Sequence, residues 1–156
     1  IVKKGLTMKK HKAAGIVPYI VEDDSYHPKV LLIKSDLGWE FPKGRVESNE
    51  TTLTAAIRET KEETGLSDLK IHHRFRYISK YNITKNFSTG EKLEAPEPKQ
   101  VTYFLAESAN KNDTLSFEHQ EFGWFSFIEA REKLKNTKKY KVLNSVIQFF
   151  TDKKYL

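Results

Sequence analysis

The chain has 156 residues, 38% of them hydrophobic and 12% aromatic, which is enough for a single domain with its own core. It has no cysteine, which excludes a disulfide framework, thiol catalysis and thiolate metal sites. Its 27 basic and 21 acidic residues leave a net charge of +6, which favours anionic partners, polyphosphates first and RNA second. No apolar run is long enough to span a membrane, and the first ten residues contain no signal-peptide core. We therefore expect a cytoplasmic protein that is a monomer or weak dimer.

The first part of the chain predicts two strands. Residues 1–11 are interpreted as a basic leader, and 12–156 as the single domain. A strand is predicted over 13–21, where Pro18 indicates an edge strand or a bulge. A second strand is predicted over 30–33, and a polar turn then leads to the sequence WEFPKG at 39–44.

A helix is predicted over 51–64, because apolar or small residues recur there at helical spacing: Leu53, Ala56, Ile57, Thr60 and Thr64. Asn49 or Ser48 is the expected N-cap. Gly65 is expected in the left-handed conformation just past the end.

Three carboxylates, those of Glu59, Glu62 and Glu63, crowd one side of this predicted helix near its C-terminal end. The helix dipole disfavours acids at that end, and the glutamates repel one another at this spacing. Arg58 alone does not neutralise three acids. A bound hard dication would explain the arrangement. The alternative is a solvated acidic surface.

The second half predicts three strands and two helices. Strands are expected over 71–81, 101–106 and 122–125, and a mobile loop over 84–98 because of its glycine and prolines. Ser126 and Glu129 form a capping box that starts a helix ending at Leu134. A last amphipathic helix is predicted over 139–150. Successive strands with few helices indicate an α+β fold with a mixed sheet.

The residues from Gly44 to Leu66 resemble the Nudix box, the signature of the Nudix hydrolases. The spacing is Gly44, five residues, Glu50, seven residues, Arg58-Glu59, two residues, Glu62-Glu63, one residue and Gly65. The one departure is Thr60, where the family prefers an aliphatic residue. The resemblance implies an α/β/α sandwich with a mixed β-sheet flanked by helices. It also implies Mg²⁺ or Mn²⁺ held by Glu59, Glu62, Glu63 and the carbonyl of Gly44.

Sequences outside the box are similar to those of the asymmetrical diadenosine tetraphosphate hydrolases within this family. They are WEFPKG before the box and FRYISKY, PKQVTYFLA and EHQEFGWF after it. The resemblance implies that the substrate is bound by these residues: Lys43, Tyr81, Lys99, Tyr103 and His119. The alternatives are core aromatics for the tyrosines, a surface lysine for Lys99 and a structural histidine for His119.

The expected reaction is metal-assisted hydrolysis of a phosphoanhydride in a nucleoside polyphosphate. Candidates for the general base are Glu63, Glu118 and Glu121, of which the last two are alternatively loop charges. Arg58 is expected to orient Glu62 or Glu63, and Glu50 to tie the loop to the helix start. Three functions are considered: hydrolysis of diadenosine tetraphosphate to ATP and AMP, removal of pyrophosphate or a cap from RNA 5′ ends, and a non-catalytic nucleotide-sensing domain.

Overall fold

The computed structural model describes residues 10–22, 27–111 and 121–153. Its eight strands form one mixed sheet with the order β3-β2-β1-β7-β5, to which β4, β6 and β8 are added by pairing with β1, β7 and β2. The strands are β1 His11–Ile20, β2 Lys29–Ser35, β3 Gly38–Glu40, β4 Lys43–Arg45, β5 Leu69–Ile71, β6 Tyr77–Lys85, β7 Lys92–Ser108 and β8 Glu121–Ser126. The helices are α1 Thr52–Thr64, α2 Phe127–Leu134 and α3 Lys139–Asp152.

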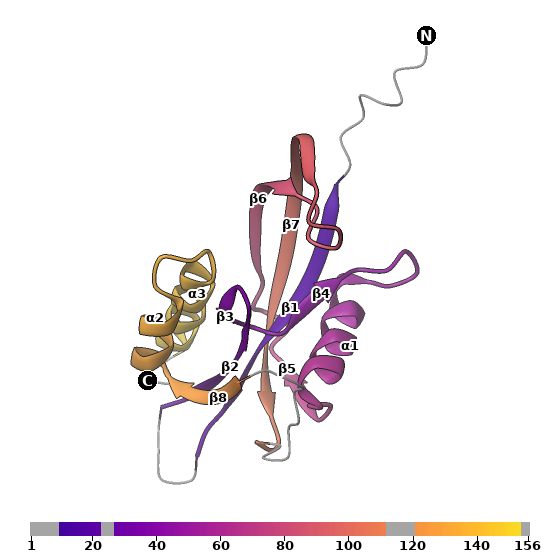
Figure 1. Cartoon of the computed structure of the whole chain (residues 1–156). Helices are drawn as coiled ribbons and strands as arrows, with labels where there is room; N and C mark the ends of the chain where they lie inside the picture. The colour runs from indigo at the N-terminus through magenta and orange to yellow at the C-terminus, as the bar shows by residue number, and fades with distance from the viewer. Residues whose placement is uncertain (1–9, 23–26, 112–120, 154–156) are drawn as a thin grey trace.

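Helices cover both faces of the sheet, with α1 on one side and α2 and α3 on the other (Figure 1). Successive residues of a strand point to opposite faces, so β1 contributes to two cores. Ala14 and Ile16 pack with Ala55 and Ala56 of α1. Ala13 and Val17 belong to the larger core, which is completed by residues of α2 and α3. The expected α+β fold with a mixed, helix-flanked sheet is confirmed.

Strand β1 lies inside the sheet, so the expectation of an edge strand is wrong. It runs parallel to β7 on one side and antiparallel to β4 and β2 on the other. Residues 13–15 pair with β4, residues 19–20 pair with β2, and Pro18 falls between these two paired segments. A proline is tolerated there because no ladder hydrogen bond is required of it on that side. The strand begins at His11, which the sequence analysis assigned to the leader.

The predicted strand over 71–81 is partly correct, because Ile71 ends β5 and residues 77–81 belong to β6, whereas the predicted loop over 84–98 is wrong. Residues 72–76 form a turn between β5 and β6, in which the amide of Phe75 donates to the carbonyl of His72. Strand β7 is 17 residues long and pairs antiparallel with both β5 and β6. Residues 84–98 therefore belong mostly to a β-hairpin. Pro96 and Pro98 precede the part of β7 that pairs with β1, and prolines are compatible with such an edge.

The two C-terminal helices follow the prediction closely. The Ser126 hydroxyl accepts from the amide of Glu129 and the Glu129 carboxylate accepts from the amide of Ser126, which confirms the capping box of α2. Helix α3 buries Val142, Leu143, Val146 and Phe150 against the sheet. No helix in the described part of the chain has the length and apolar character needed to cross a membrane.

Candidate active site

Helix α1 begins one residue later than predicted, and its N-cap is Thr51. Asn49 and Ser48 were expected in this role and do not fill it. The Thr51 hydroxyl accepts from the amide of Thr54, and the Thr54 hydroxyl in turn accepts from the amide of Thr51. At the other end Gly65 adopts a φ of 74°, as predicted. Thr60 is fully buried, and its hydroxyl donates to the carbonyl of Ala56 at 2.8 Å, which satisfies the polar atom inside the core.

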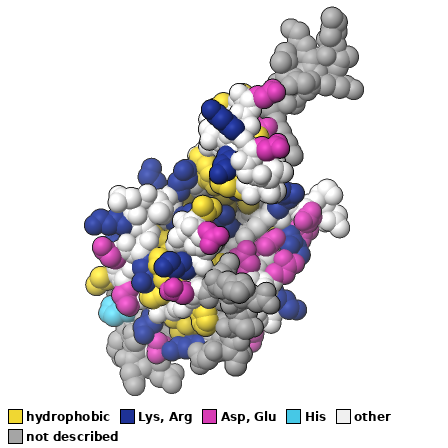
Figure 2. Space-filling model, in the orientation of Figure 1, with side chains coloured by type: hydrophobic (Ala, Val, Ile, Leu, Met, Phe, Trp, Pro, Cys, Tyr) yellow, Lys and Arg dark blue, Asp and Glu magenta, His cyan; other side chains and the backbone are white. Residues whose placement is uncertain are grey.

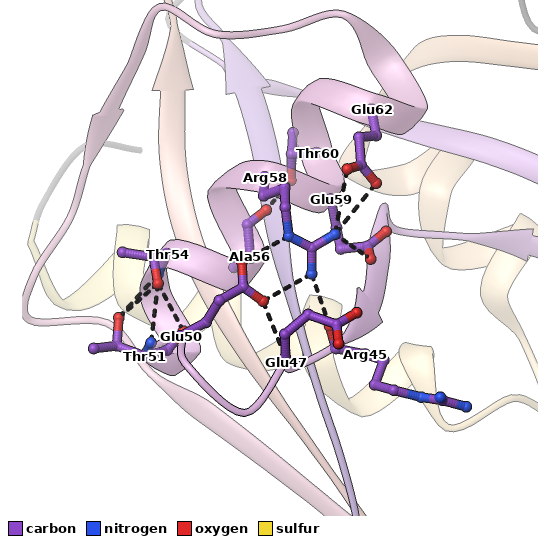
Figure 3. Close-up of polar contacts among 10 residues, drawn as sticks. All are labelled: Arg45, Glu47, Glu50, Thr51, Thr54, Ala56, Arg58, Glu59, Thr60 and Glu62. Atoms are coloured by element: carbon purple, nitrogen blue, oxygen red, sulfur yellow. Dashed lines mark hydrogen bonds and ion pairs between the residues drawn. The ribbon is translucent and has the colours of Figure 1, made fainter.

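Arg58 is the centre of the charged network on α1 (Figure 3). Its Nε donates to Glu50 Oε2 at 2.6 Å and one terminal nitrogen donates to Glu50 Oε1 at 2.9 Å. The other terminal nitrogen donates to Glu59 at 2.9 Å and to both oxygens of Glu62 at 3.3 Å. The Arg58 guanidinium and the amide of Glu47 lower the pKa of Glu50 to about 2. The loop before α1 is therefore tied to the helix through Glu50, as predicted.

Glu63 lies outside this network. Its Oε2 accepts from the backbone amide of Lys43 at 3.3 Å. Burial raises the pKa of Glu63 to about 7, with the carboxylates of Glu40 and Glu59 adding to the effect. Arg58 thus orients Glu59 and Glu62, whereas Glu63 is held by the backbone of β4.

Strand β4 brings the two halves of the site together. Lys43 and Gly44 are consecutive, so their side-chain positions face opposite sides of the sheet. On the α1 side, a Cβ added to Gly44 would lie 2.0 Å from the Glu59 carboxyl carbon, so only glycine permits this approach. On the other side, Lys43 is in register with Gly15 of β1, which is in register with Tyr103 of β7.

The same face continues along β6 and β7, where Tyr77 is opposite Tyr103 and Tyr81 is opposite Lys99. Lys43, Tyr81, Lys99 and Tyr103, predicted from separate stretches of sequence, all line one cleft of about 890 Å³. We call it the lysine cleft. Tyr103 is buried at its floor, which agrees with the core alternative, and Tyr81 is half-buried. Burial lowers the pKa of Lys99, and the nearby Lys43 adds to this effect.

Sequence reasoning missed the lysines at the start of α3. Lys138, Lys139 and Lys141 line the same cleft, and Lys138 Nζ lies 4.6 Å from the centre of the Tyr81 ring. Burial lowers the pKa of Lys139, with a further contribution from Lys43. A signal for these residues exists in the sequence, because cations at a helix N-terminus oppose the dipole just as acids do at the C-terminus.

Charge separates the molecule into two regions. Figure 2 shows acidic side chains gathered on the side of α1 and the loop before it, whereas Lys and Arg dominate the side of α2 and α3. Glu40 of β3 also lines the lysine cleft, and its carboxylate acts electrostatically on both Glu63 and Lys139. The acidic and basic regions therefore meet at β3 and β4.

The remaining predicted residues do not join this assembly within the described structure. Glu121 is the first residue of β8, and its side chain is 70% exposed. Its carboxylate lies 3.9 Å from Nζ of Lys34 in β2. It lines neither the lysine cleft nor the site around Lys43. Glu118 and His119 lie outside the described residues.

The chemistry of the α1 site suits a divalent cation. Glu59, Glu62 and Glu63 offer carboxylate oxygens within one turn and a half of helix, and the absence of a side chain at Gly44 lets the Glu59 carboxylate lie against the backbone of β4. Hard dications prefer such oxygens. Among the described residues, no three acidic or histidine side chains converge on one point where they could bind a metal ion. Glu59 and Glu62 point to Arg58, and Glu63 points to the backbone amide of Lys43.

Comparison with known proteins gives consistent results. The NUDIX domain family matches residues 9–146. The asymmetrical bis(5′-nucleosyl)-tetraphosphatase of Mus musculus is 34% identical over 130 residues, which cover 76% of this chain and 81% of the mouse protein. The RNA pyrophosphohydrolase of Helicobacter pylori strain P12 is 30% identical over 121 residues, covering 76% of this chain and 77% of that protein.

Among solved structures, a C. elegans Ap4A hydrolase in a binary complex superimposes with a TM-score of 0.73. It is 30% identical, and the match covers 91% of this chain and 98% of the other.

Proposed function

The chain belongs to the Nudix hydrolase family, and on that premise we propose that its substrate is diadenosine tetraphosphate, which it hydrolyses to ATP and AMP. The observation that carries the proposal is the lysine cleft, where aromatic and cationic side chains gather next to the carboxylates of α1. A dinucleoside polyphosphate offers a base for the aromatic side chains and several phosphates for the cations. The similarity to asymmetrical bis(5′-nucleosyl)-tetraphosphatases supports the same substrate.

Nudix hydrolases generally use divalent metal ions. In our proposal Mg²⁺ or Mn²⁺ is held by Glu59, Glu62, Glu63 and the carbonyl of Gly44. The ion would neutralise charge on the phosphates and lower the pKa of a bound water. Arg58 donates to both Glu59 and Glu62 and so keeps these two carboxylates beside each other on α1.

The reaction consumes one water and breaks one P–O bond. AMP keeps one phosphate, so the broken bond lies between the first and second phosphates counted from one adenosine. The oxygen of water bonds to phosphorus, and the leaving oxygen departs on the other fragment. We assign the proton of the water to Glu63, which is partly buried and held against the backbone of Lys43 between α1 and the lysine cleft. Glu118 and Glu121 remain the other candidates, and the exposure of Glu121 disfavours it.

The cleft residues have distinct roles in this proposal. Lys43 and Lys99 bind phosphates as compact charges. Tyr81 stacks on one adenine. This adenine would displace the Lys138 ammonium from the face of the Tyr81 ring, and the ammonium could then contact the phosphates. Tyr103 forms the floor beneath, and His119 would contact the substrate from residues outside the described structure. We place the protein in the cytoplasm, in keeping with its lack of cysteine, and propose that it is a monomer or weak dimer.

The second candidate is removal of pyrophosphate from RNA 5′ ends, which the similarity to RNA pyrophosphohydrolases supports. The two activities differ in salt dependence, since RNA makes many phosphate contacts and its affinity falls steeply with salt. The test is a panel of nucleotides and 5′-triphosphorylated RNA with Mg²⁺, at two salt concentrations, with products separated by chromatography. We expect ATP and AMP from diadenosine tetraphosphate as the fastest reaction. Faster turnover of the RNA would overturn the proposal.

A further inference from the structure

A second hollow adjoins the lysine cleft. It has a volume of about 700 Å³ and lies beside the hairpin of β6 and β7, which we call the arm. The two hollows share the side chains of Lys43, Phe87 and Lys99. We call the second one the arm pocket. Because Lys43 borders both, and its backbone amide donates to Glu63, the hollows meet beside the proposed general base.

The tip of the arm is an ordered turn that presents Phe87. The amide of Asn86 donates to the carbonyl of Glu91 at 2.8 Å, and the amide of Gly90 donates to the carbonyl of Asn86 at 2.7 Å. The Asn86 side-chain oxygen accepts from the amide of Ser88 at 2.9 Å. Phe87 is 61% exposed, so its ring is accessible to a ligand. Lys99 Nζ lies 5.7 Å from the centre of its ring.

The walls of the arm pocket combine apolar and cationic groups. Ile83 and Leu93 line it together with Phe87, and its cations include Lys10, Lys12 and Arg45. Glu97 is the only carboxylate among the described residues that line it, and it lies 3.0 Å from His11 Nε2. Figure 2 shows hydrophobic side chains gathered where the arm joins the body of the molecule, with Lys and Arg side chains around them.

We propose that the arm pocket binds the second nucleoside of a dinucleoside polyphosphate, with Phe87 as the platform for its base and Lys10, Lys12 and Arg45 against the phosphates nearest to it. This inference rests on the proposed function and extends it. One base lies on Tyr81 in the lysine cleft, the polyphosphate crosses Lys43 beside Glu63, and the other base reaches Phe87. A single nucleotide fills only one of the two hollows, so the arm selects for substrates with two bases.

The test compares two ligands that differ by one nucleoside, diadenosine tetraphosphate and adenosine 5′-tetraphosphate. Their dissociation constants are measured in chelator, where no turnover occurs, for wild type and Phe87→Ala. We expect Phe87→Ala to weaken the binding of diadenosine tetraphosphate about 5-fold or more, which is the lower end for loss of one base stack. The binding of adenosine 5′-tetraphosphate should weaken less, because its one base lies on Tyr81 and Phe87 only borders that cleft. Ile128→Ala is the matched control, because Ile128 of α2 is 81% exposed and lines neither hollow, and it should change neither affinity.

The outcomes separate this inference from the proposed function. Equal affinities of wild type and Phe87→Ala for both ligands, or an equal loss for both, would overturn the inference even if wild type hydrolyses diadenosine tetraphosphate. A selective loss in a protein that does not hydrolyse diadenosine tetraphosphate would support the arm pocket and remove the proposed function. A loss of affinity for 5′-triphosphorylated RNA alone would assign the pocket to RNA and overturn the inference.

Discussion

The last turns of α1 carry carboxylates and the first turn of α3 carries ammonium groups, so each has charge of the sign that its helix dipole disfavours. The unfavourable charges on α1 and on α3 have different partners. On α1, Arg58 donates to Glu50, Glu59 and Glu62, so most of the acids are paired within the chain. On α3, Lys139 faces Lys43 across the lysine cleft, and burial together with this like charge lowers its pKa.

The difference shows how each region is prepared for its partner. Glu59 and Glu62 of α1 are paired with Arg58 within the chain, so both would have to turn from Arg58 to bind a metal ion. The lysines of the cleft repel one another, and an anionic substrate would relieve that repulsion. Glu63 differs from both groups, because its carboxylate is partly buried, is not paired with Arg58 and has a raised pKa. Substitutions that remove one charge or one contact from the acidic end of α1 or from the lysine cleft test this difference.

The largest expected effect comes from the acidic region. Glu62→Gln and Glu63→Gln should each lower kcat by on the order of 10³-fold, because both remove a proposed metal ligand. Chelator should abolish the activity of wild type, and Mg²⁺ or Mn²⁺ should restore it. The control is Glu132→Gln, which replaces an exposed glutamate of α2. Near-normal turnover in both site variants would exclude these glutamates as metal ligands.

The next effect comes from the basic region. Lys43→Met should lower kcat by about 10²-fold with a smaller change in KM, because charge on the phosphates grows during cleavage and Lys43 meets it there. Lys135→Met, at an exposed lysine of the connection after α2, is the matched control and should leave kcat unchanged. A rise in KM without loss of kcat would limit Lys43 to ground-state binding.

Tyr81→Ala should raise KM by about 5- to 150-fold and leave kcat nearly unchanged, since a stacked adenine is bound similarly in ground and transition states. Tyr81→Phe keeps the ring and should keep most of the affinity. Steady-state kinetics with diadenosine tetraphosphate measure both variants. Loss of kcat at constant KM would contradict the stacking role.

The smallest effect concerns stability. The pKa of Glu63 is raised to about 7, so its ionised form destabilises the metal-free fold increasingly as pH rises from about 4.5 to 7. At pH 8, metal-free Glu63→Gln should therefore melt a few degrees above wild type, because a domain of this size gains about 2–4 °C in Tm per kcal/mol. At pH 4, where Glu63 is protonated, the variant and wild type should melt at the same temperature. Glu62→Gln is the comparison, because Glu62 is 57% exposed and bonded to Arg58 and should give no such gain. Equal melting of Glu63→Gln and wild type at pH 8 would contradict the burial argument.

Local sequence determined the extent of α1 and which of its charged side chains are neighbours. The spacing of Glu59, Glu62 and Glu63 brings the three acids together near the end of α1, and Gly65 ends the helix as predicted. Interactions within one turn follow directly from sequence separation, because the helix repeat fixes which residues are neighbours. The capping box of α2 and the buried face of α3 follow for the same reason, whereas the N-cap of α1 is Thr51 and not the expected Asn49 or Ser48.

Tertiary structure decided the rest, because contacts between distant segments depend on strand register rather than on local spacing. Pro18, Pro96 and Pro98 suggested edges or loops, and only the pairing partners of β1 and β7 show that strands continue through them. Tyr81, Lys99 and Lys138 meet because β6 pairs with β7 and α3 packs on the same face. The sequence thus determined which charges the chain carries on its helices, and the sheet decided which of them face one another across the cleft.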